Sequence, residues 1–367
     1  MWLFLAFLGG NGVSVAHAAA PFPSDCPTAT YLGNDPATDL PDWSENAQGV
    51  ANDGVHWYFT NKSTLFKYTS DWRSVDGTDE GRVASVPIPS ELADLGIDHY
   101  GDLDHHEGYL FVPFEGGDRT VIAVFRASDL SLADWEEVTA LQGKAGWAAV
   151  EPEESLLYTS HNQLDASTPL IRYDFDLIAV EDGAPGGFLA HLGALPVEEE
   201  DGSPLVGRFT YMQGGVFTPQ GDLFLSVGTG EDDPVDVRGG LHVLRWNADR
   251  TALRVVQSSV NESGHIGDGV FAYEYHPGSV FQGEEPEGID YWPRGASEPY
   301  AGDLHAILLD NDLTDDQIWL KHYDLAYPCQ PLPIDCTDSC DEAGTGSGSV
   351  AALMLIGVGW FRRRPST

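Results

Sequence analysis

Basic residues are scarce in this chain of 367 residues, which has 18 Lys and Arg against 58 Asp and Glu and a formal net charge of −40. A surface this acidic repels phosphate backbones, so nucleic acid is a poor partner. The same charge attracts divalent cations and basic surfaces. The alternative is that this negative charge is a general adaptation to solvent or salt and serves no specific partner.

The motifs of several common chemistries are also absent. The sequence has no G-x-S-x-G elbow, no H-E-x-x-H pair and no P-loop. It has no C-x-x-C pair, which argues against a zinc site or a thioredoxin-like redox site. Methionine is limited to 3 residues, whereas Gly (41) and Pro (23) are abundant and aromatic residues make up 11%. This composition favours many short strands and tight turns over long helices.

Cysteine is rare, and none of the four lies between Cys26 and Cys329. A Cys26–Cys329 disulfide would tie the two ends of the folded region together, which suits a closed fold in an oxidising compartment. A local Cys329–Cys336 bond is the alternative. Residues 1–20 have the pattern of a signal peptide, with an apolar run from Trp2 to Leu8 and an A-x-A cleavage site at Ala16-His17-Ala18. We therefore expect export.

Internal repeats organise the middle of the chain. Five segments, starting at Gln48, Tyr100, Ala145, Gly214 and Glu287, share a leading Gly, a short strand, a turn, a second strand rich in aromatic and β-branched residues, and a third strand. The leading glycines are Gly49, Gly101, Gly146, Gly215 and Gly288. Units of this kind are typical of β-propeller blades, which bury their faces only by packing on their neighbours.

The repeats predict an all-β fold, a five-bladed β-propeller over residues 26–329. Each of the first four units continues into a fourth strand, and the segment "CPTATYLG" near the N-terminus would supply the missing outer strand of the last blade. A sixth blade in the poorly matching region 259–286 is the alternative, and a β-sandwich is a second one.

The C-terminus combines three features in a fixed order. Cys340 precedes a Gly/Ser linker, an apolar segment runs from Val350 to Phe361, and Arg362, Arg363 and Arg364 follow. This order resembles the myxobacterial MYXO-CTERM sorting domain. The resemblance implies a linker with the sorting Cys (330–349), a transmembrane segment with an Arg-rich tail (350–367), recognition by envelope sorting machinery, processing near Cys340 and display on the cell surface. A plain C-terminal membrane anchor is the alternative.

Propeller geometry predicts which polar residues meet. Residues that enter the first strand of each blade share one face of the disc with the loops after the second strands. The entering residues are Asn46, Gln48, His99, Asp102, Lys144, Gln213, Glu287 and Asp290; the loops carry Asn61, Lys62, Glu115, His161, Asn162, Glu231 to Asp233 and Asp310 to Asp312.

These side chains support three kinds of site. Hard oxygen ligands suit Ca²⁺, so we expect Asp102, Glu287 and Asp290 as metal ligands, with Gln213 nearby. The acid–base candidates are His99, His161 and Glu115, and a carboxylate pair on this face would suit glycoside chemistry. The ligand-binding candidates are Gln48, Asn61, Asn162 and Gln213. The alternative is structural: Asp102 would bond neighbouring strands, and the acidic loops would be ordinary turns.

Two further groups of residues have simpler interpretations. Trp57-Tyr58-Phe59, Tyr109, Phe111, Tyr158, Phe224 and Trp319 recur on second or third strands and are expected to pack between blades. Trp43, Trp147, Tyr291 and Trp292 are expected mainly as core or rim, with stacking on a sugar ring as the alternative. The pair His105-His106 is expected in a hairpin turn on the far face, exposed to solvent.

Together these patterns predict an exported, surface-anchored β-propeller that binds a carbohydrate or protein ligand, with Ca²⁺ as its candidate ion. The alternative is a secreted hydrolase or lyase with its site at the mouth of the central channel. A structural envelope protein without a small ligand is a third interpretation.

Overall fold

The computed structural model describes residues 28–35, 42–75, 78–181, 186–228, 238–258, 284–310 and 317–327. The chain divides into two units, Met1–Pro328 and Cys329–Thr367, and every described residue belongs to the first. The described residues form mainly strands, with two short helices, α1 (Ser90–Ala93) and α2 (Leu177–Glu181). Neither helix has the length or the apolar character needed to cross a membrane.

Several predictions from the sequence concern residues outside these ranges. They are the signal peptide (1–20), both cysteines of the proposed Cys26–Cys329 disulfide, the 330–349 linker with Cys340, and the 350–367 tail with its arginines. These stay predictions.

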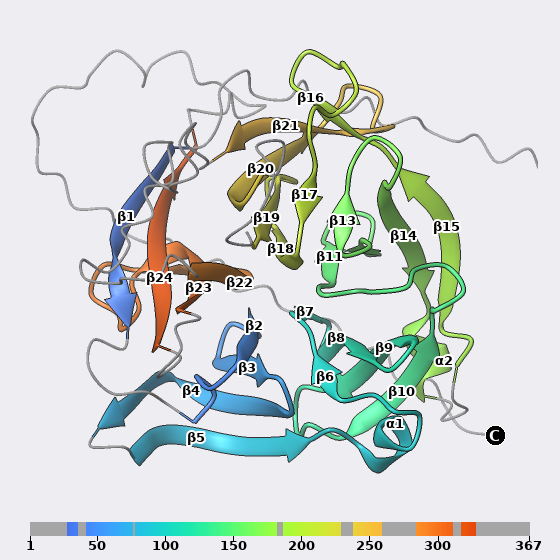
Figure 1. The fold of residues 1–367 in the computed structure, drawn as a ribbon. Helices are drawn as coiled ribbons and strands as arrows, with labels where there is room; N and C mark the ends of the chain where they lie inside the picture. Colours follow the sequence, from blue (N-terminus) through green and yellow to red (C-terminus); the bar gives the residue numbers. More distant parts are fainter. Residues whose placement is uncertain are drawn as a thin grey trace, which may run out of the picture. The chain divides into compact units, whose positions relative to one another are not determined.

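Five sheets are arranged around a common axis (Figure 1), which confirms the predicted five-bladed β-propeller. From the axis outwards, blade 1 consists of β2 (Ala47–Asn52), β3 (His56–Asn61), β4 (Thr64–Val75) and β5 (Thr78–Pro87). Blade 2 has two short inner strands, β6 (His99–Tyr100) and β7 (Asp104–His106), followed by β8 (Tyr109–Gly116), β9 (Arg119–Arg126) and β10 (Leu132–Glu137). Blade 3 consists of β11 (Ala149–Glu151), β12 (Leu156–Thr159), β14 (Leu170–Phe175) and β15 (Leu189–Leu195).

The last two blades show how the ring is extended and closed. Blade 4 consists of β18 (Met212–Phe217), β19 (Leu223–Val227), β20 (Gly240–Trp246) and β21 (Leu253–Ser258), with β16 (Val197–Glu199) parallel to β21 at its outer edge. A two-stranded ribbon pairs β13 (Gln163–Leu164) with β17 (Phe209–Thr210). In the chain, β13 lies between β12 and β14 of blade 3, and β17 directly precedes β18 of blade 4. Blade 5 consists of β22 (Glu284–Arg294), β23 (Gly302–Asp310), β24 (Gln317–Ala326) and β1 (Thr28–Asp35).

The first strand in the chain closes the ring, as the sequence predicts. Strand β1 pairs antiparallel with β24, from Thr28 opposite Ala326 to Asp35 opposite Leu320. It is thereby the outer strand of the last blade, which covers an edge that would otherwise be free to pair with other chains.

The hydrophobic core is divided among the five interfaces between neighbouring blades. Each interface has its own cluster of buried apolar residues, and each cluster draws from two adjacent blades. Trp57, Tyr58, Phe111, Tyr158 and Phe224 are fully buried in these clusters, as the repeat pattern predicts. The stability of each blade therefore depends on its neighbours, because a single sheet cannot bury both its faces.

The five inner strands approach one another closely at one glycine each. These residues are Gly49, Gly101, Gly146, Gly214 and Gly288. A Cβ added at Gly288 would lie 2.5 Å from the Cα of Gly49, and one added at Gly101 would lie 2.4 Å from the carbonyl oxygen of Gly146. The fourth axial glycine is Gly214 and not the predicted Gly215, because Gly214 pairs with Ser226 as Gly49 pairs with Thr60.

Candidate functional site

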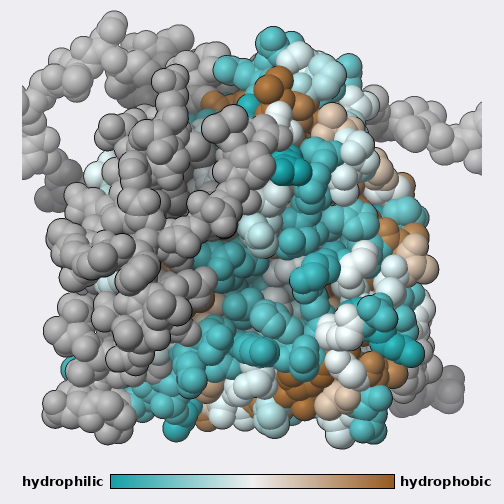
Figure 2. Space-filling view, in the orientation of Figure 1, coloured by the Kyte–Doolittle hydropathy of each residue, from teal (hydrophilic) through white to brown (hydrophobic). Residues whose placement is uncertain are grey.

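A cavity of about 480 Å³ lies at one end of the axis and receives side chains from all five blades. Its polar lining includes Asn46 and Gln48 (blade 1), His99 and Glu115 (blade 2), Lys144 and Asn162 (blade 3), Gln213 (blade 4), and Glu285 and Glu287 (blade 5). The face seen along the axis is hydrophilic around its centre where described atoms are exposed (Figure 2). Residues entering the inner strands and residues after the second strands thus meet at one site.

Two β-bulges, at equivalent positions in the inner strands of blades 1 and 4, each place a glutamine side chain in the lining of this cavity. The β2–β3 pairing shifts between Ala47 and Gly49, and the β18–β19 pairing shifts between Met212 and Gly214. The extra residue is Gln48 in the first case and Gln213 in the second. A bulge leaves its extra residue outside the ladder and turns its side chain. Each glutamine contacts the inner strand of the next blade.

In blade 1, Gln48 contacts a histidine of blade 2. Gln48 Oε1 and His99 Nε2 are 2.7 Å apart, so the ring nitrogen donates to the amide oxygen and leaves Nδ1 as an acceptor. Burial lowers the pKa of His99, and the negative charge of Glu115 opposes this effect less strongly. The imidazole is therefore neutral at physiological pH, with one nitrogen available to accept a proton or a hydrogen bond.

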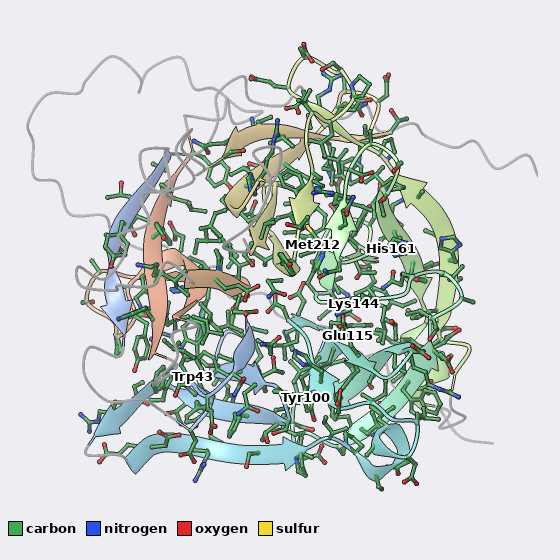
Figure 3. The ribbon with its side chains drawn as sticks, in the orientation of Figure 1. Trp43, Tyr100, Glu115, Lys144, His161 and Met212 are labelled. Atoms are coloured by element: carbon green, nitrogen blue, oxygen red, sulfur yellow. The ribbon has the colours of Figure 1, made fainter. Side chains whose placement is uncertain are left out.

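Glu115 and Lys144 form an ion pair at the rim. Glu115 lies opposite His99 in the β6–β8 pairing, and its Oε2 is 3.1 Å from Nζ of Lys144 in blade 3. Figure 3 shows the two side chains beside one another near the centre of the ring. The side chain of Lys144 is 58% exposed, so a ligand can displace or share this pair at a modest energetic cost.

In blade 4, Gln213 bridges two carboxyl groups of blade 5. Its Nε2 donates to Glu285 Oε1 at 2.7 Å and to Glu287 Oε1 at 3.3 Å. Glu287 is only 2% exposed, and its Oε2, which is itself buried, has no hydrogen-bond partner among the described residues. Burial, reinforced by the negative charges of Glu285 and Asp102, raises the pKa of Glu287 well above its usual range. Burial therefore favours the protonated form of Glu287, whose carboxyl can then donate as well as accept a hydrogen bond.

Asp102 lies within the ring of axial glycines and contacts four other blades. Its Oδ1 accepts the N–H of Val50 at 3.0 Å, and its Oδ2 accepts those of Gly215 and Ile289 at 3.1 and 3.4 Å. Its own backbone N–H donates to the carbonyl of Gly146 in blade 3 at 2.8 Å. Burial raises the pKa of Asp102, whereas the three N–H donors favour the charged form. These contacts show the structural role that the sequence left as an alternative.

The three carboxyl groups expected to bind a metal do not share one site. Asp102 faces backbone N–H groups, and Asp290 accepts a hydrogen bond from Nδ2 of Asn52 at 2.8 Å, whereas only Glu287 lines the cavity. Within the described residues, no three His, Cys, Asp or Glu side chains form a group that could hold a metal ion. Ca²⁺ binding therefore stays a prediction from the sequence.

Two other predicted site residues lie outside the cavity lining. Oδ1 of Asn61 accepts the N–H groups of Ser63 and Thr64, so Asn61 stabilises the turn between β3 and β4. His161 precedes Asn162 on the loop after β12, and only Asn162 reaches the cavity. Residues 231–233 and 311–312 are outside the described ranges.

The aromatic residues considered as sugar platforms are not in the cavity lining, and the three tryptophans among them are buried in the core. Trp147 is fully buried and its Nε1 donates to Ser160 at 2.8 Å, while Trp43 stacks on Phe59 at 4.1 Å between ring centroids. The aromatic residue that does line the cavity, Tyr211, was not among the candidates. An alignment of Asn46-Ala47-Gln48-Gly49 with Tyr211-Met212-Gln213-Gly214 would have found it.

The sequence matches no family model and no curated protein. Similar solved structures include Myxococcus xanthus glutaminyl cyclase (11% identity, 82% of this chain and 98% of that chain, TM-score 0.43). The PQQ-bound aldose sugar dehydrogenase of Streptomyces coelicolor is 13% identical over 82% of this chain and 99% of that chain, with a TM-score of 0.35. The periplasmic gluconolactonase of Pseudomonas aeruginosa is 11% identical over 75% and 71%, with a TM-score of 0.34. At these identities the similarity concerns the fold alone.

Proposed function

We propose that this protein binds a small polar ligand in the cavity at the mouth of the propeller axis, and that Glu287 is the principal contact. One observation carries the proposal: Glu287 lines the cavity and is almost completely buried, and its buried Oε2 has no hydrogen-bond partner among the described residues. A buried polar atom without a partner costs about 1–3 kcal/mol, so the fold keeps it at a cost that a bound ligand would offset.

The dimensions of the site favour a small molecule over a protein ligand. A volume of about 480 Å³ lies in the range of small-molecule sites, and the polar groups converge on it from five blades. A protein partner would need a broad surface with a buried apolar centre. The exposed large apolar side chains, such as Val55, Ile178 and Val206, belong to different blades and loops.

A binding screen with matched variants tests this proposal. Monosaccharides, disaccharides, polyols and amino acids would be screened by thermal shift, and the hits measured by calorimetry. We expect Glu287→Ala to weaken binding at least tenfold and Glu287→Gln to retain most of it, because the amide can also donate. The control is Glu200→Ala, at an exposed position. The proposal fails if no compound binds, or if Glu287→Ala binds as tightly as wild type.

A second candidate function is general acid catalysis in the same cavity. The amide of Gln213 holds Glu285 and Glu287 side by side, and the pKa of Glu287 is raised as a proton donor requires. In glycoside hydrolysis, one carboxyl protonates the leaving oxygen while the other acts at the sugar carbon or on water. Glu287 would take the first role and Glu285 the second.

Chromogenic glycosides separate the two functions. We expect turnover of at least one nitrophenyl glycoside if the site is catalytic, with a loss of at least a hundredfold in Glu287→Gln. Binding without turnover would reject the enzyme and leave the binding module. Export and anchoring at the cell surface are part of the proposal and rest on the patterns at the two ends of the sequence.

A further inference from the structure

Tyr211 and Asn46 occupy the same place in two different blades. Each immediately precedes the bulged inner strand of its blade, and each has a left-handed backbone, with φ of 51° and 54°. The carbonyl of Tyr211 accepts the N–H of Gly228 at 2.8 Å, and that of Asn46 accepts the N–H of Lys62 at 2.9 Å. The repeat therefore imposes this backbone conformation on whichever residue stands there.

The two residues differ in how well they tolerate that conformation. Asparagine enters the left-handed region readily, whereas a bulky residue such as tyrosine is unfavourable there. The side chain of Tyr211 also remains 41% exposed at the cavity, so packing does not account for its presence. A strained residue held at the edge of a site points to a role in that site.

We infer that the ligand is a neutral pyranose whose ring stacks on Tyr211. This inference rests on the proposed function and names its substrate class. The C–H face of a sugar ring packs on an aromatic face, while its hydroxyl groups need donors and acceptors nearby. Gln213, two residues from Tyr211, and the carboxyl of Glu287 line the same cavity and would provide them. The acidic residues of the lining (Asp98, Glu115, Glu285 and Glu287) outnumber its basic residues (Arg119 and Lys144), which disfavours an acidic sugar.

The test compares rings with open chains. Methyl β-glucopyranoside, methyl β-galactopyranoside and methyl α-mannopyranoside would be measured beside sorbitol and galactitol by calorimetry and saturation-transfer NMR. We expect one pyranoside to bind more tightly than either polyol, with saturation concentrated on the protons of one ring face. Tyr211→Asn should weaken its binding roughly tenfold, and Tyr211→Phe less than threefold.

Tyr211→Asn also serves as its own folding control, because it installs the residue that the equivalent position already carries. Its melting temperature should equal or exceed that of wild type. The inference is overturned if Tyr211→Asn binds the pyranoside as tightly as wild type, if polyols bind as well as rings, or if no pyranoside binds. In each case the Glu287→Ala variant tests the proposed function separately. If the variant loses binding of whichever compound the wild type binds, the proposed function stands; if that binding persists, the proposed function is rejected.

Discussion

Asp102 in blade 2 and Gly215 in blade 4 are joined directly across the axis, because Oδ2 of Asp102 accepts the backbone N–H of Gly215 at 3.1 Å. The two blades are not neighbours in the ring. The same carboxylate also holds Val50 and Ile289, and its backbone bonds blade 3. Through its side chain and its backbone, this one residue thus connects all five blades beneath the cavity.

Removal of this carboxylate should therefore destabilise the whole ring. Asp102→Ala leaves three buried N–H groups without acceptors, so we expect it to lower the free energy of unfolding by about 3–5 kcal/mol. Asp102→Asn keeps one acceptor oxygen and should cost less. Urea denaturation followed by tryptophan fluorescence measures both. The exposed Asp118→Asn is the control; an equal, small effect of all three would contradict the role of Asp102.

The inner strands approach one another so closely at the axis that we expect Gly288 to tolerate no side chain. A Cβ there would lie 2.5 Å from Oδ1 of Asp102 and 2.7 Å from the backbone nitrogen of Val50, and neither can move freely. We expect Gly288→Ala to destabilise the protein by about 3 kcal/mol or more, or to prevent folding. Gly295→Ala is the matched control, because the nearest atom to its Cβ lies 4.0 Å away. Comparable melting temperatures for the two variants would refute this prediction.

Asp290 should make the stability of the protein depend on pH. Burial, reinforced by the negative charge of Asp104, raises the pKa of Asp290 to about 8, although its hydrogen bond from Asn52 opposes the shift. A carboxyl whose pKa is raised by folding stabilises the fold fully at pH below about 4, and this contribution is lost as the pH rises towards 8. Wild type should therefore lose about 3 kcal/mol between pH 6 and pH 9.

Asp290→Asn removes this titrating group while keeping a similar shape. Its free energy of unfolding should change less over the same pH range, although Asp104, whose pKa is raised to about 7 by burial, still contributes. Denaturant titrations at four pH values give the two curves. Parallel curves for wild type and Asp290→Asn would show that Asp290 does not titrate in this range.

Glu287 should impose the same sign of pH dependence on ligand binding. If its protonated form donates to the ligand, affinity falls as the pH rises through its raised pKa, by up to tenfold per pH unit beyond that value. Glu287→Gln cannot lose this proton, so its affinity should stay constant. Calorimetry of a ligand from the screen at increasing pH compares the two proteins. An affinity that rises with pH in wild type would mean that the ionised carboxylate is the binding form.

Two histidines, His105 and His106, show where a sequence pattern fails to predict burial. His105 and His106 look like a metal pair in the sequence, and we expected them to be exposed in a hairpin turn. They belong to strand β7 and are half-buried, and the turn consists of Glu107 and Gly108, both with positive φ. Burial of these rings lowers their pKa values. The turn is thus two residues shorter than expected, which leaves both histidines in the strand and half-buried.

The sequence by itself determined the ring. Its repeated glycines and its alternation of aromatic and β-branched residues predicted five blades, the strand that closes the last blade, and the face on which Gln48, His99, Lys144, Gln213 and Glu287 meet. These features follow from short-range periodicity, which a repeat makes visible. Only the tertiary structure decided which groups each carboxyl contacts. Asp102 bonds backbone groups, Asp290 accepts a hydrogen bond from Asn52, and Glu287 lines the cavity, because strand register and close approach across the axis select the partners of each side chain.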